Sequence, residues 1–304
     1  MKPLISIVIP THRPNHFKVA LMCALSQTYK NIEIIVSDNS DSDEIKNICA
    51  KHSKVIYRKN TDGKPTSNIA KPLTLAQGEY IKYLFDDDLI YPHCIDSMLG
   101  WLSRIPENLA KSVGLITSSR HLINDESVSF DELKLPEILH PRVIDGKIVV
   151  KNMLINHNNF IGEFSTILFK RKFIDQQDPD NIFSIFNEEF KSGLIDVPLY
   201  ISILSQSNMF YLPYSLSAFR KHKSGGSDPS TNPSFHHAVS DWFRLIQGAY
   251  RSGLLNAPEA ISAAQKYLAL SKSFIPIFPS ELQPWDISAN QFIKSTGTIK
   301  ESSI

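Results

Sequence analysis

The chain has 304 residues, enough to bury the core of one large domain or two smaller ones. Its formal net charge of +1 gives no support for nucleic-acid binding, which usually needs a concentrated basic face, so we expect no nucleic-acid partner. The apolar runs are too short for a membrane span, and the N-terminal one is too short for a signal peptide. Three cysteines (Cys23, Cys49, Cys94) lie in apolar helical patterns and predict buried thiols in a reducing compartment. These features predict a cytoplasmic protein.

Predicted strands and helices alternate along the first 120 residues. Runs rich in β-branched residues predict strands over residues 4–10, 32–37, 55–60, 80–85 and 113–119. Apolar residues at helical spacing predict helices over 15–27, 41–52, 65–80 and 93–105, the third disturbed by Pro72 and closed by Gly78. This alternation predicts an α/β fold with a parallel sheet covered on both faces. Residues 130–189 follow no regular pattern and receive no assignment.

The composition changes beyond His222. A Gly/Ser/Pro-rich linker over residues 223–234 predicts a boundary between a first domain (1–226) and a C-terminal helical region (227–304). Within the latter, residues 235–255 keep an apolar helical face, and Asn256 with Glu259 forms a capping-box pattern before a second helix. The apolar stretch 273–279 is open to packing on the first domain, which we favour, or to peripheral contact with a membrane. The apolar helices also offer a surface for a homodimer.

Polar residues follow three of the predicted strands. Thr11, His12 and Arg13 follow the first, Asp38 and Asn39 the second, and Asp86–Asp88 the fourth. Ligands of parallel α/β sheets bind beyond the carboxyl ends of the strands, so we expect a polar cleft there. Asp38 is equally suited to cap the following helix, and the aspartate triplet has the alternative of a solvated turn.

Three adjacent carboxylates repel one another unless a cation neutralises them. Mg²⁺ and Mn²⁺ prefer such oxygen ligands and keep open positions for substrate phosphates. The sequence has no Gly-rich phosphate-binding loop of either common type, so a metal would have to offset the charge of a diphosphate. The pattern therefore predicts a nucleoside-diphosphate site with Mn²⁺ or Mg²⁺.

Four blocks of the sequence resemble one known family. They are "SIVIPTHRP", "ALSQTYKNIEIIVSDNSDSD", "AQGEYIKYLFDDDLIYP" and "GLIDVPLYISILSQ" with the later "YLPYSLSAFRKH". In this order and spacing, residues 4 to about 222 resemble family 2 glycosyltransferases. The resemblance implies the GT-A fold, a Rossmann-like and mostly parallel sheet flanked by helices. It also implies metal-dependent, inverting transfer of a sugar from a nucleotide-sugar donor to a hydroxyl.

The resemblance assigns residues to the donor and the metal. The implied donor-binding residues are Pro10, Thr11, Arg13, Asp38, Gly63, Lys64, Asn68, Asp86, Asp87 and Arg220. The metal pattern fits in two registers, with Asp86 and Asp88 or with Asp87 and Asp88 as the pair of acids. In either register Asp86 is placed for the ribose or the sugar. His222 is implied as a late metal ligand or diphosphate contact, and Arg220 as a charge partner for phosphate.

A carboxylate must take the proton of the acceptor hydroxyl in an inverting transfer. The resemblance assigns this role to Asp196, which is also suited to cap the helix that follows. Glu188 and Glu189 are rivals in a less patterned region. Gly162 and Glu163 fall in the block that the family places beneath the acceptor.

Several positions depart from the family pattern. Phe85, Ser37, Ser67 and Ile195 stand where the family often has acids or an arginine. These departures keep open a non-catalytic protein that binds nucleotide sugars or acts as a scaffold. A nucleotidyltransferase is disfavoured because no glycine follows the first strand. For an enzyme, we expect a UDP-sugar donor, and an acceptor that is a glycan, lipid-linked or protein-linked, in bacterial-type polysaccharide or glycoconjugate assembly.

Overall fold

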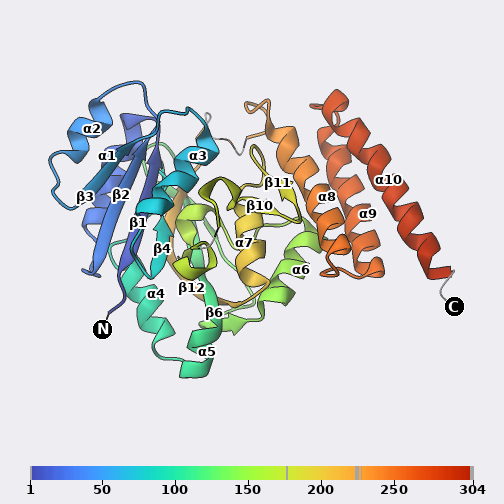
Figure 1. Ribbon diagram of the computed structural model, residues 1–304, viewed down its shortest axis with the longest axis horizontal. Coiled ribbons are helices and arrows are strands. Elements are labelled where there is room, and N and C mark those ends of the chain that lie inside the picture. Colours follow the sequence, from blue (N-terminus) through green and yellow to red (C-terminus); the bar gives the residue numbers. More distant parts are fainter. Residues whose placement is uncertain (1, 176, 223–225, 227, 302–304) are drawn as a thin grey trace. The chain divides into compact units, whose positions relative to one another are not determined.

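The computed structural model describes residues 2–175, 177–222, 226 and 228–301 (Figure 1). The chain forms two compact units. The first comprises residues 1–146, 160–182 and 206–222, and the second comprises residues 147–159, 183–205 and 223–304. The sequence predicted a single boundary after residue 226, within a linker (223–234) that lies partly outside the described residues. The structure instead assigns residues 147–159 and 183–205 to the same unit as the C-terminal helices.

The first unit is built on a ten-stranded sheet with the main path β3-β2-β1-β4-β9-β6-β12-β5. β7 pairs with β6, and β8 pairs with β12. The strands are β1 (Ile5–Thr11), β2 (Ile32–Asp38), β3 (Val55–Lys59), β4 (Tyr80–Tyr83), β5 (Leu89–Ile90), β6 (Val113–Ile123), β7 (Ser129–Leu133), β8 (Arg142–Ile144), β9 (Leu168–Lys170) and β12 (Asn208–Arg220).

The sheet is mixed, with a parallel core. β3, β2, β1 and β4 pair in parallel, as do β6 and β12. The short strand β9 lies antiparallel between β4 and β6, so those two strands run in the same direction. The predicted α/β fold is therefore confirmed, and the structure adds the antiparallel strands that the irregular region 130–189 did not reveal.

Helices and 3₁₀ turns cover this sheet. They are α1 (Pro14–Leu25), α2 (Glu44–Cys49), α3 (Pro65–Ala70), η1 (Lys71–Leu75), α4 (Cys94–Leu102), α5 (Glu107–Ser112), η2 (Phe164–Thr166), η3 (Arg171–Phe173) and η4 (Pro179–Asn181). The predicted helix over 65–80 is thus α3 followed by η1, because Pro72 has no N–H to continue the α-helical ladder.

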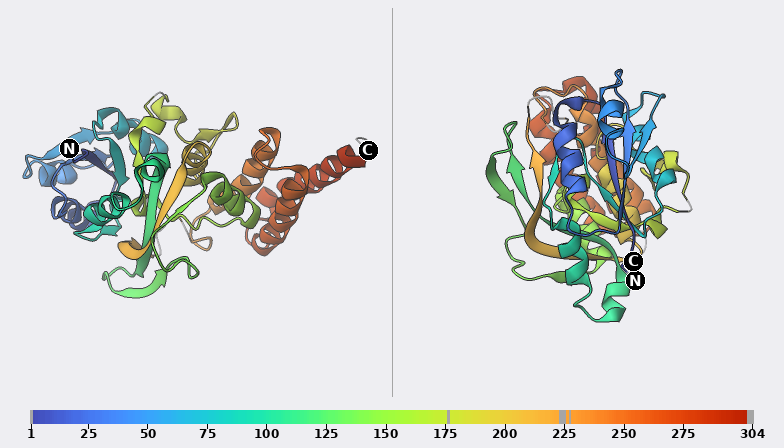
Figure 2. Two further views of the ribbon diagram at one scale, coloured as in Figure 1. Left: turned by 90° about the horizontal axis from the view of Figure 1, so that it is seen from below. Right: turned by 90° about the vertical axis from the view of Figure 1, so that its left-hand side faces the viewer.

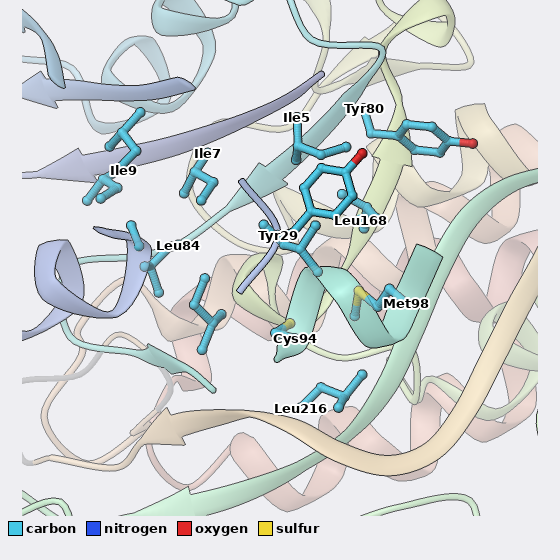
Figure 3. Packing of buried hydrophobic residues seen from close by; sticks show 14 of the residues in the cluster. Ile5, Ile7, Ile9, Tyr29, Tyr80, Leu84, Cys94, Met98, Leu168 and Leu216 are labelled. Carbon is cyan, nitrogen blue, oxygen red and sulfur yellow. The ribbon is translucent and has the colours of Figure 1, made fainter. Parts of the chain in front are cut away.

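Alternation along β1 builds the core. Ile5, Ile7 and Ile9 are fully buried on one face, where they pack with residues of α1 and α4 (Figure 3). Cys49 and Cys94 are buried free thiols as predicted, while Cys23 is half-buried. Because the core fixes β1, β2 and β4 side by side, their carboxyl ends meet at one edge.

The second unit is mainly helical. It contains most of α6 (Gly146–Asn156), the hairpin β10 (Ser184–Ile185) and β11 (Glu188–Glu189), and α7 (Asp196–Leu204). α8 (Phe235–Arg251), α9 (Ala257–Phe274) and α10 (Pro279–Glu301) pack side by side, drawn orange to red in Figure 2. The predicted capping box of α9 is confirmed, because Asn256 and Glu259 each accept a 2.9 Å backbone hydrogen bond from the other.

The apolar stretch 273–279 packs within its own unit. The ring of Phe274 lies 5.3 Å from that of Phe235, and the ring of Phe278 lies 5.7 Å from His236, both on α8. These contacts account for part of its apolar surface, and the expectation that it packs on the first domain stays a prediction. Membrane contact and a homodimer stay predictions.

Candidate active site

A cleft lies where β1, β2 and β4 end. It has a volume of about 410 Å³. Its walls come from the turns after the three strands and from the start of α3. The lining residues are Pro10, Thr11, His12, Arg13, Asn39, Ser40, Asp41, Pro65, Asn68, Ile69, Phe85, Asp86 and Asp87. The predicted polar cleft at these strand ends is therefore present, and it is large enough for part of a small ligand.

Asp86 is bound to the end of β1. Its Oδ2 accepts a 2.7 Å hydrogen bond from the hydroxyl of Thr11 and a 3.2 Å bond from the backbone N–H of His12. Burial raises the pKa of Asp86, and the adjacent charge of Asp87 raises it further. Asp86 thus joins the first and fourth strand ends, as the sequence pattern predicted.

Asp38 is fully buried at the end of β2, and both its oxygens have partners. Oδ1 accepts a 2.8 Å bond from Ser40 N–H, while Oδ2 accepts bonds from the hydroxyl of Tyr57 at 2.7 Å and the ammonium of Lys59 at 3.1 Å. The neighbours Asn39 and Ser40, rather than Asp38, line the cleft. Asp38 therefore shapes the turn, and its contact with a base edge stays a prediction. Sequence reasoning missed Tyr57 and Lys59, which come from β3.

Asn68 ties α3 to the strand ends. Its Nδ2 donates a 3.0 Å bond to the backbone oxygen of Thr11, and its Oδ1 accepts a 2.8 Å bond from Ser37. Ser37, where the family often has an acid, therefore donates a hydrogen bond that a carboxylate could not. Gly63 has a φ of +68° in the turn before α3, and Lys64 occupies the N-terminal cap position. Neither Gly63 nor Lys64 lines the cleft, and their contact with the donor stays a prediction.

The remaining two aspartates face the end of β12. Asp87 lies 3.0 Å from Nε2 of His222, whose side chain is 7% exposed. Asp88 is buried, and its Oδ1 accepts a 3.1 Å bond from the backbone N–H of Arg220. Burial raises the pKa of Asp88 well above its usual range, and the charge of Asp87 adds to that shift. Asp87 is therefore next to His222 and Asp88 next to the backbone of Arg220, while the joint role of Asp87, Asp88 and His222 at a metal stays a prediction.

The guanidinium of Arg220 binds protein rather than facing the cleft. It donates to the backbone oxygens of Asp87 at 2.8 Å, Asn124 at 2.5 Å and Asp125 at 3.0 Å, and to the hydroxyl of Ser127 at 2.9 Å. Arg220 thus holds the aspartate turn against the loop between β6 and β7. Its predicted contact with phosphate stays a prediction.

The carboxylates are suited to a hard cation. Burial raises the pKa values of Asp86 and Asp88, and Asp87 adds a third carboxylate beside them. Within the described residues, no group of three or more His, Cys, Asp or Glu side chains is arranged to hold a metal ion. A Mg²⁺ or Mn²⁺ ion would complete its shell with water and substrate oxygens, as these ions usually do.

Asp196 lies in the second unit, at the start of α7. Its Oδ2 accepts a 2.7 Å bond from Nδ2 of Asn159, and its Oδ1 accepts a 2.9 Å bond from Val197 N–H. The carboxylate therefore has a fixed orientation, and Asn159 is a partner that sequence reasoning did not identify. The rival Glu188 is engaged by two arginines, Arg244 at 3.0 Å and Arg251 at 2.6 Å. Glu188 is therefore occupied by two ion pairs, and the role of Asp196 as base stays a prediction.

The predicted acceptor-side residues Gly162 and Glu163 lie in the first unit, just before η2. Gly162 has a φ of +107°, a conformation that favours glycine. Glu163 forms an ion pair with Arg120 of β6, with Nη2 3.2 Å from Oε1. Arg120 is buried, so the pair fixes the loop that enters η2.

A sequence profile of Glycosyl transferase family 2 matches residues 6–172, more than half of the chain. The chain belongs to this family. The matched range contains the ends of β1, β2 and β4 and the whole cleft. The resemblance read from the four sequence blocks is therefore confirmed at the level of family and fold.

Two relatives of this chain match it over alignments of different length. An uncharacterised glycosyltransferase from Rickettsia typhi is 35% identical over 105 residues, which are 34% of this chain and 33% of that protein. The GalNAc(5)-diNAcBac-PP-undecaprenol beta-1,3-glucosyltransferase of Campylobacter jejuni is 26% identical over 227 residues, 72% of this chain and 65% of that protein. The matched part of the chain thus spans about a third of the first relative and less than two thirds of the second.

Solved structures support the fold. S. aureus TarS 1-349 in complex with UDP-GlcNAc superposes with a TM-score of 0.64 at 14% identity, covering 96% of this chain and 81% of that one. At this identity the similarity shows a shared fold. Within the described part of this chain, no helix combines the length and apolar character needed to cross a membrane.

Proposed function

We propose that this family 2 member is a metal-dependent inverting glycosyltransferase that uses a UDP-sugar donor. One observation carries the proposal. Three carboxylates from one turn, two of them buried with raised pKa values, lie at the end of β4 beside a cleft of about 410 Å³. A diphosphate–metal complex would offset this charge, whereas a solvated turn would leave the carboxylates exposed.

The cleft would bind the nucleotide part of the donor. Pro10 and Thr11 provide the wall at the end of β1, and Arg13 brings a cation to the rim. Asn39 and Ser40, positioned by the buried Asp38, offer polar groups for the base. UDP-GlcNAc and UDP bound to the structural neighbour TarS support a uridine nucleotide over the other nucleotides.

Asp87 and His222 would hold the metal, with Asp88 or Asp86 as the second carboxylate. When bound, Mn²⁺ or Mg²⁺ would stabilise the negative charge that develops on the leaving diphosphate. The chain's own residues prepare this position, because Arg220 fixes the backbone of Asp87 and Thr11 fixes the carboxylate of Asp86. Gly63, Lys64 and Asn68 stay candidates for contacts with the diphosphate or the sugar.

Asp196 would act as the general base. As the acceptor oxygen forms its bond to the anomeric carbon, the bond from that carbon to the diphosphate oxygen breaks, and Asp196 takes the hydroxyl proton. Attack from the face opposite the leaving group inverts the configuration. The hydrogen bond from Asn159 orients one carboxylate oxygen of Asp196. The proposed base is therefore held in a fixed orientation before the acceptor binds.

The acceptor is proposed by comparison. The name of the Campylobacter relative specifies a lipid-linked oligosaccharide, and we extend this acceptor class to the present protein. Assembly of a bacterial glycoconjugate or polysaccharide would use such an acceptor. Gly162 and Glu163 are the proposed acceptor-side residues of the first unit.

Calorimetric titration of UDP, GDP and dTDP, with and without Mn²⁺, tests the donor site. We expect UDP to bind only with Mn²⁺, and Asp87→Ala to weaken that binding by at least about tenfold. The exposed Asp43→Ala is the matched control, because Asp43 forms a surface ion pair with Lys46 and does not line the cleft. Failure of all three nucleotides to bind would overturn the proposal.

Release of UDP from UDP-GlcNAc, with water as acceptor, tests the catalytic role. We expect Asp196→Asn to lower the turnover by about 100-fold or more while UDP affinity stays unchanged. Nucleotide binding without turnover for any of the donors or acceptors tried would support the non-catalytic, nucleotide-sugar-binding alternative instead.

A further inference from the structure

One face of α8 contacts the segment that leads into Asp196. The contacts come from three positions of this helix, Asp241, Arg244 and Gly248, which are three and four residues apart and so share one helical face. All of the contacts lie within the second unit. They reach residues 186–194, which end two residues before the proposed base.

Gly248 contacts the tip of the β10–β11 hairpin. Phe186 and Asn187 at this tip have φ values of 56° and 62°, a strained conformation for a bulky residue such as Phe186. A Cβ atom on Gly248 would lie 2.5 Å from the ring of Phe186. The absence of a side chain at Gly248 therefore allows the ring to pack directly on the helix and stabilise the strained turn.

Arg244 contacts the strand that follows. It donates a 3.0 Å bond to Glu188 and a 2.9 Å bond to the backbone oxygen of Glu189. Its guanidinium also lies 4.4 Å from the ring centroid of Phe190, which is 1% exposed. The planar guanidinium thus fixes three consecutive residues in one geometry.

Asp241 holds the last part of the segment. Its side chain is buried, and its Oδ2 accepts a 3.1 Å bond from Leu194 N–H while Oδ1 accepts a 2.8 Å bond from Arg244. The approach is close, because a Cβ atom on Gly193 would lie 2.7 Å from backbone atoms of His237 and Ala238. Burying a carboxylate is costly unless it accepts hydrogen bonds, so Asp241 favours the conformation in which it keeps both. The bond from Leu194 N–H therefore fixes the backbone of Leu194.

We propose that Asp241 of α8 is a positioning residue for the general base Asp196, so that the C-terminal helical region serves catalysis through the segment 186–195. This inference rests on the proposed function, in which Asp196 takes the acceptor proton. The partner of Asp196, Asn159, follows α6, and α6 is bound to α9 by the ion pair between Lys151 and Glu259 at 2.8 Å. The C-terminal helices therefore support both the base and its hydrogen-bond donor.

The test uses the full chain with UDP-GlcNAc and Mn²⁺, and measures UDP release, UDP affinity and amide hydrogen exchange of residues 186–199. We expect Asp241→Ala to lower kcat at least about tenfold with KM within about twofold, because the base and not the donor site is displaced. Exchange in 186–199 should rise. Asp241→Asn keeps an oxygen for Leu194 N–H and should restore kcat to within about threefold of wild type.

Gly193→Ala disturbs the same contact from the other side. We expect it to lower kcat as Asp241→Ala does, and the double variant to be no more than about threefold slower than either single one, since both changes release the same segment. Ser271→Ala, a buried substitution in α9 of the same unit, is the control for a change in the helical core outside this segment. It should leave kcat and the exchange of 186–199 unchanged.

The outcomes separate this inference from the proposed function. Wild-type turnover that is lost in Asp196→Asn but kept in Asp241→Ala would overturn the positioning role and leave the proposed function standing. Additive losses in the double variant, or an equal loss in Ser271→Ala, would also overturn it. A wild-type protein that binds UDP-GlcNAc and never releases UDP would remove the proposed function and this inference with it.

Discussion

Lys82 lies fully buried in β4, on the strand that carries the aspartates. It stands in alternation with the core residues Tyr80 and Leu84, so its stem shares their apolar face. Its Nζ donates to the backbone oxygens of Ser165 at 2.7 Å and Ile167 at 3.1 Å, around η2. Burial lowers the pKa of Lys82, and the nearby Asp88 opposes that shift. Lys82 therefore connects β4 to the turn that supports the aspartates.

The same turn contacts the aspartates directly. The hydroxyl of Ser165 accepts a 2.9 Å bond from Phe85 N–H and also hydrogen-bonds Asp88. Lys82 thus fixes the backbone of Ser165 while Ser165 fixes the start of the aspartate turn. The site depends on a buried amine that does not reach the cleft.

We expect Lys82→Met to lower the free energy of unfolding by about 3 kcal/mol, because two buried carbonyl oxygens would lose their donor. Urea denaturation of the full chain measures the change. Lys54→Met, at an exposed position, is the control and should change stability by less than about 0.5 kcal/mol. Equal stability of the two variants would show that the bonds from Lys82 do not contribute.

The residues of the cleft differ in how far they can be predicted. Asp86, Asp87 and Asp88 are predictable because three charges at the end of an apolar run have few structural explanations. The role of Lys82 is not predictable from the sequence, because its partner Ser165 lies 83 residues away, in a region without a regular pattern. The same holds for Tyr57 and Lys59, whose bonds to Asp38 depend on the pairing of β2 with β3.

At the level of elements, β4 begins where Gly78 passes close to β1. Gly78 N–H donates a 2.9 Å bond to the hydroxyl of Ser6, and a Cβ atom on Gly78 would lie 2.5 Å from Ser6 N and 2.9 Å from Leu4 O. These are backbone atoms of β1 and of the residue just before it, so they cannot move aside without disturbing the pairing. The order of β1 and β4, and with it the cleft, depends on this close approach.

We expect Gly78→Ala to lower the free energy of unfolding by about 3 kcal/mol, because the methyl group would push β4 away from β1. Gly100→Ala is the matched control. Gly100 lies inside α4, and a Cβ atom there would meet nothing within 4 Å. Because alanine favours the helix more than glycine does, Gly100→Ala should stabilise the protein by about 0.5 kcal/mol. Chemical denaturation measures both, and a Gly78 variant as stable as wild type would contradict the prediction.

The elements that sequence reasoning recovered have strong local signals. β1 and β2 are rich in β-branched residues, and α9 has a capping box at its start. β9 has three residues and pairs antiparallel between two strands that are distant in sequence, so no local pattern marks it. Short elements of this kind form because their neighbours provide the pairing, which a local reading does not contain.

At the scale of the whole molecule, the division of the chain depends on contacts between distant segments. A change in composition near residue 223 indicates a linker, but it does not show which segments pack together. Contacts such as Lys151–Glu259, which are 108 residues apart, place α6 with the C-terminal helices. The unit that carries Asp196 is therefore assembled from three separate stretches of the sequence.

The second unit contains a histidine that links its stability to pH. The ring of His157 lies against Trp242 and Tyr267, with centroids 5.8 and 6.4 Å away. Burial lowers the pKa of His157 to about 4, and the charge of Lys266 acts in the same direction. The unfolded chain, with an ordinary histidine pKa of about 6.5, binds the proton more tightly than the folded chain does. Stability is therefore fully present above about pH 6.5 and falls as the pH decreases towards 4.

We expect wild type to lose about 2 kcal/mol more unfolding free energy than His157→Asn between pH 7.5 and pH 5. Asparagine removes the titrating group and tolerates the φ of 50° at this position, so the variant keeps the backbone of the turn after α6. Urea denaturation at the two pH values measures the difference, and every other titrating group is common to both proteins. If the two proteins lose the same free energy, protonation of His157 does not limit the stability of the fold in acid.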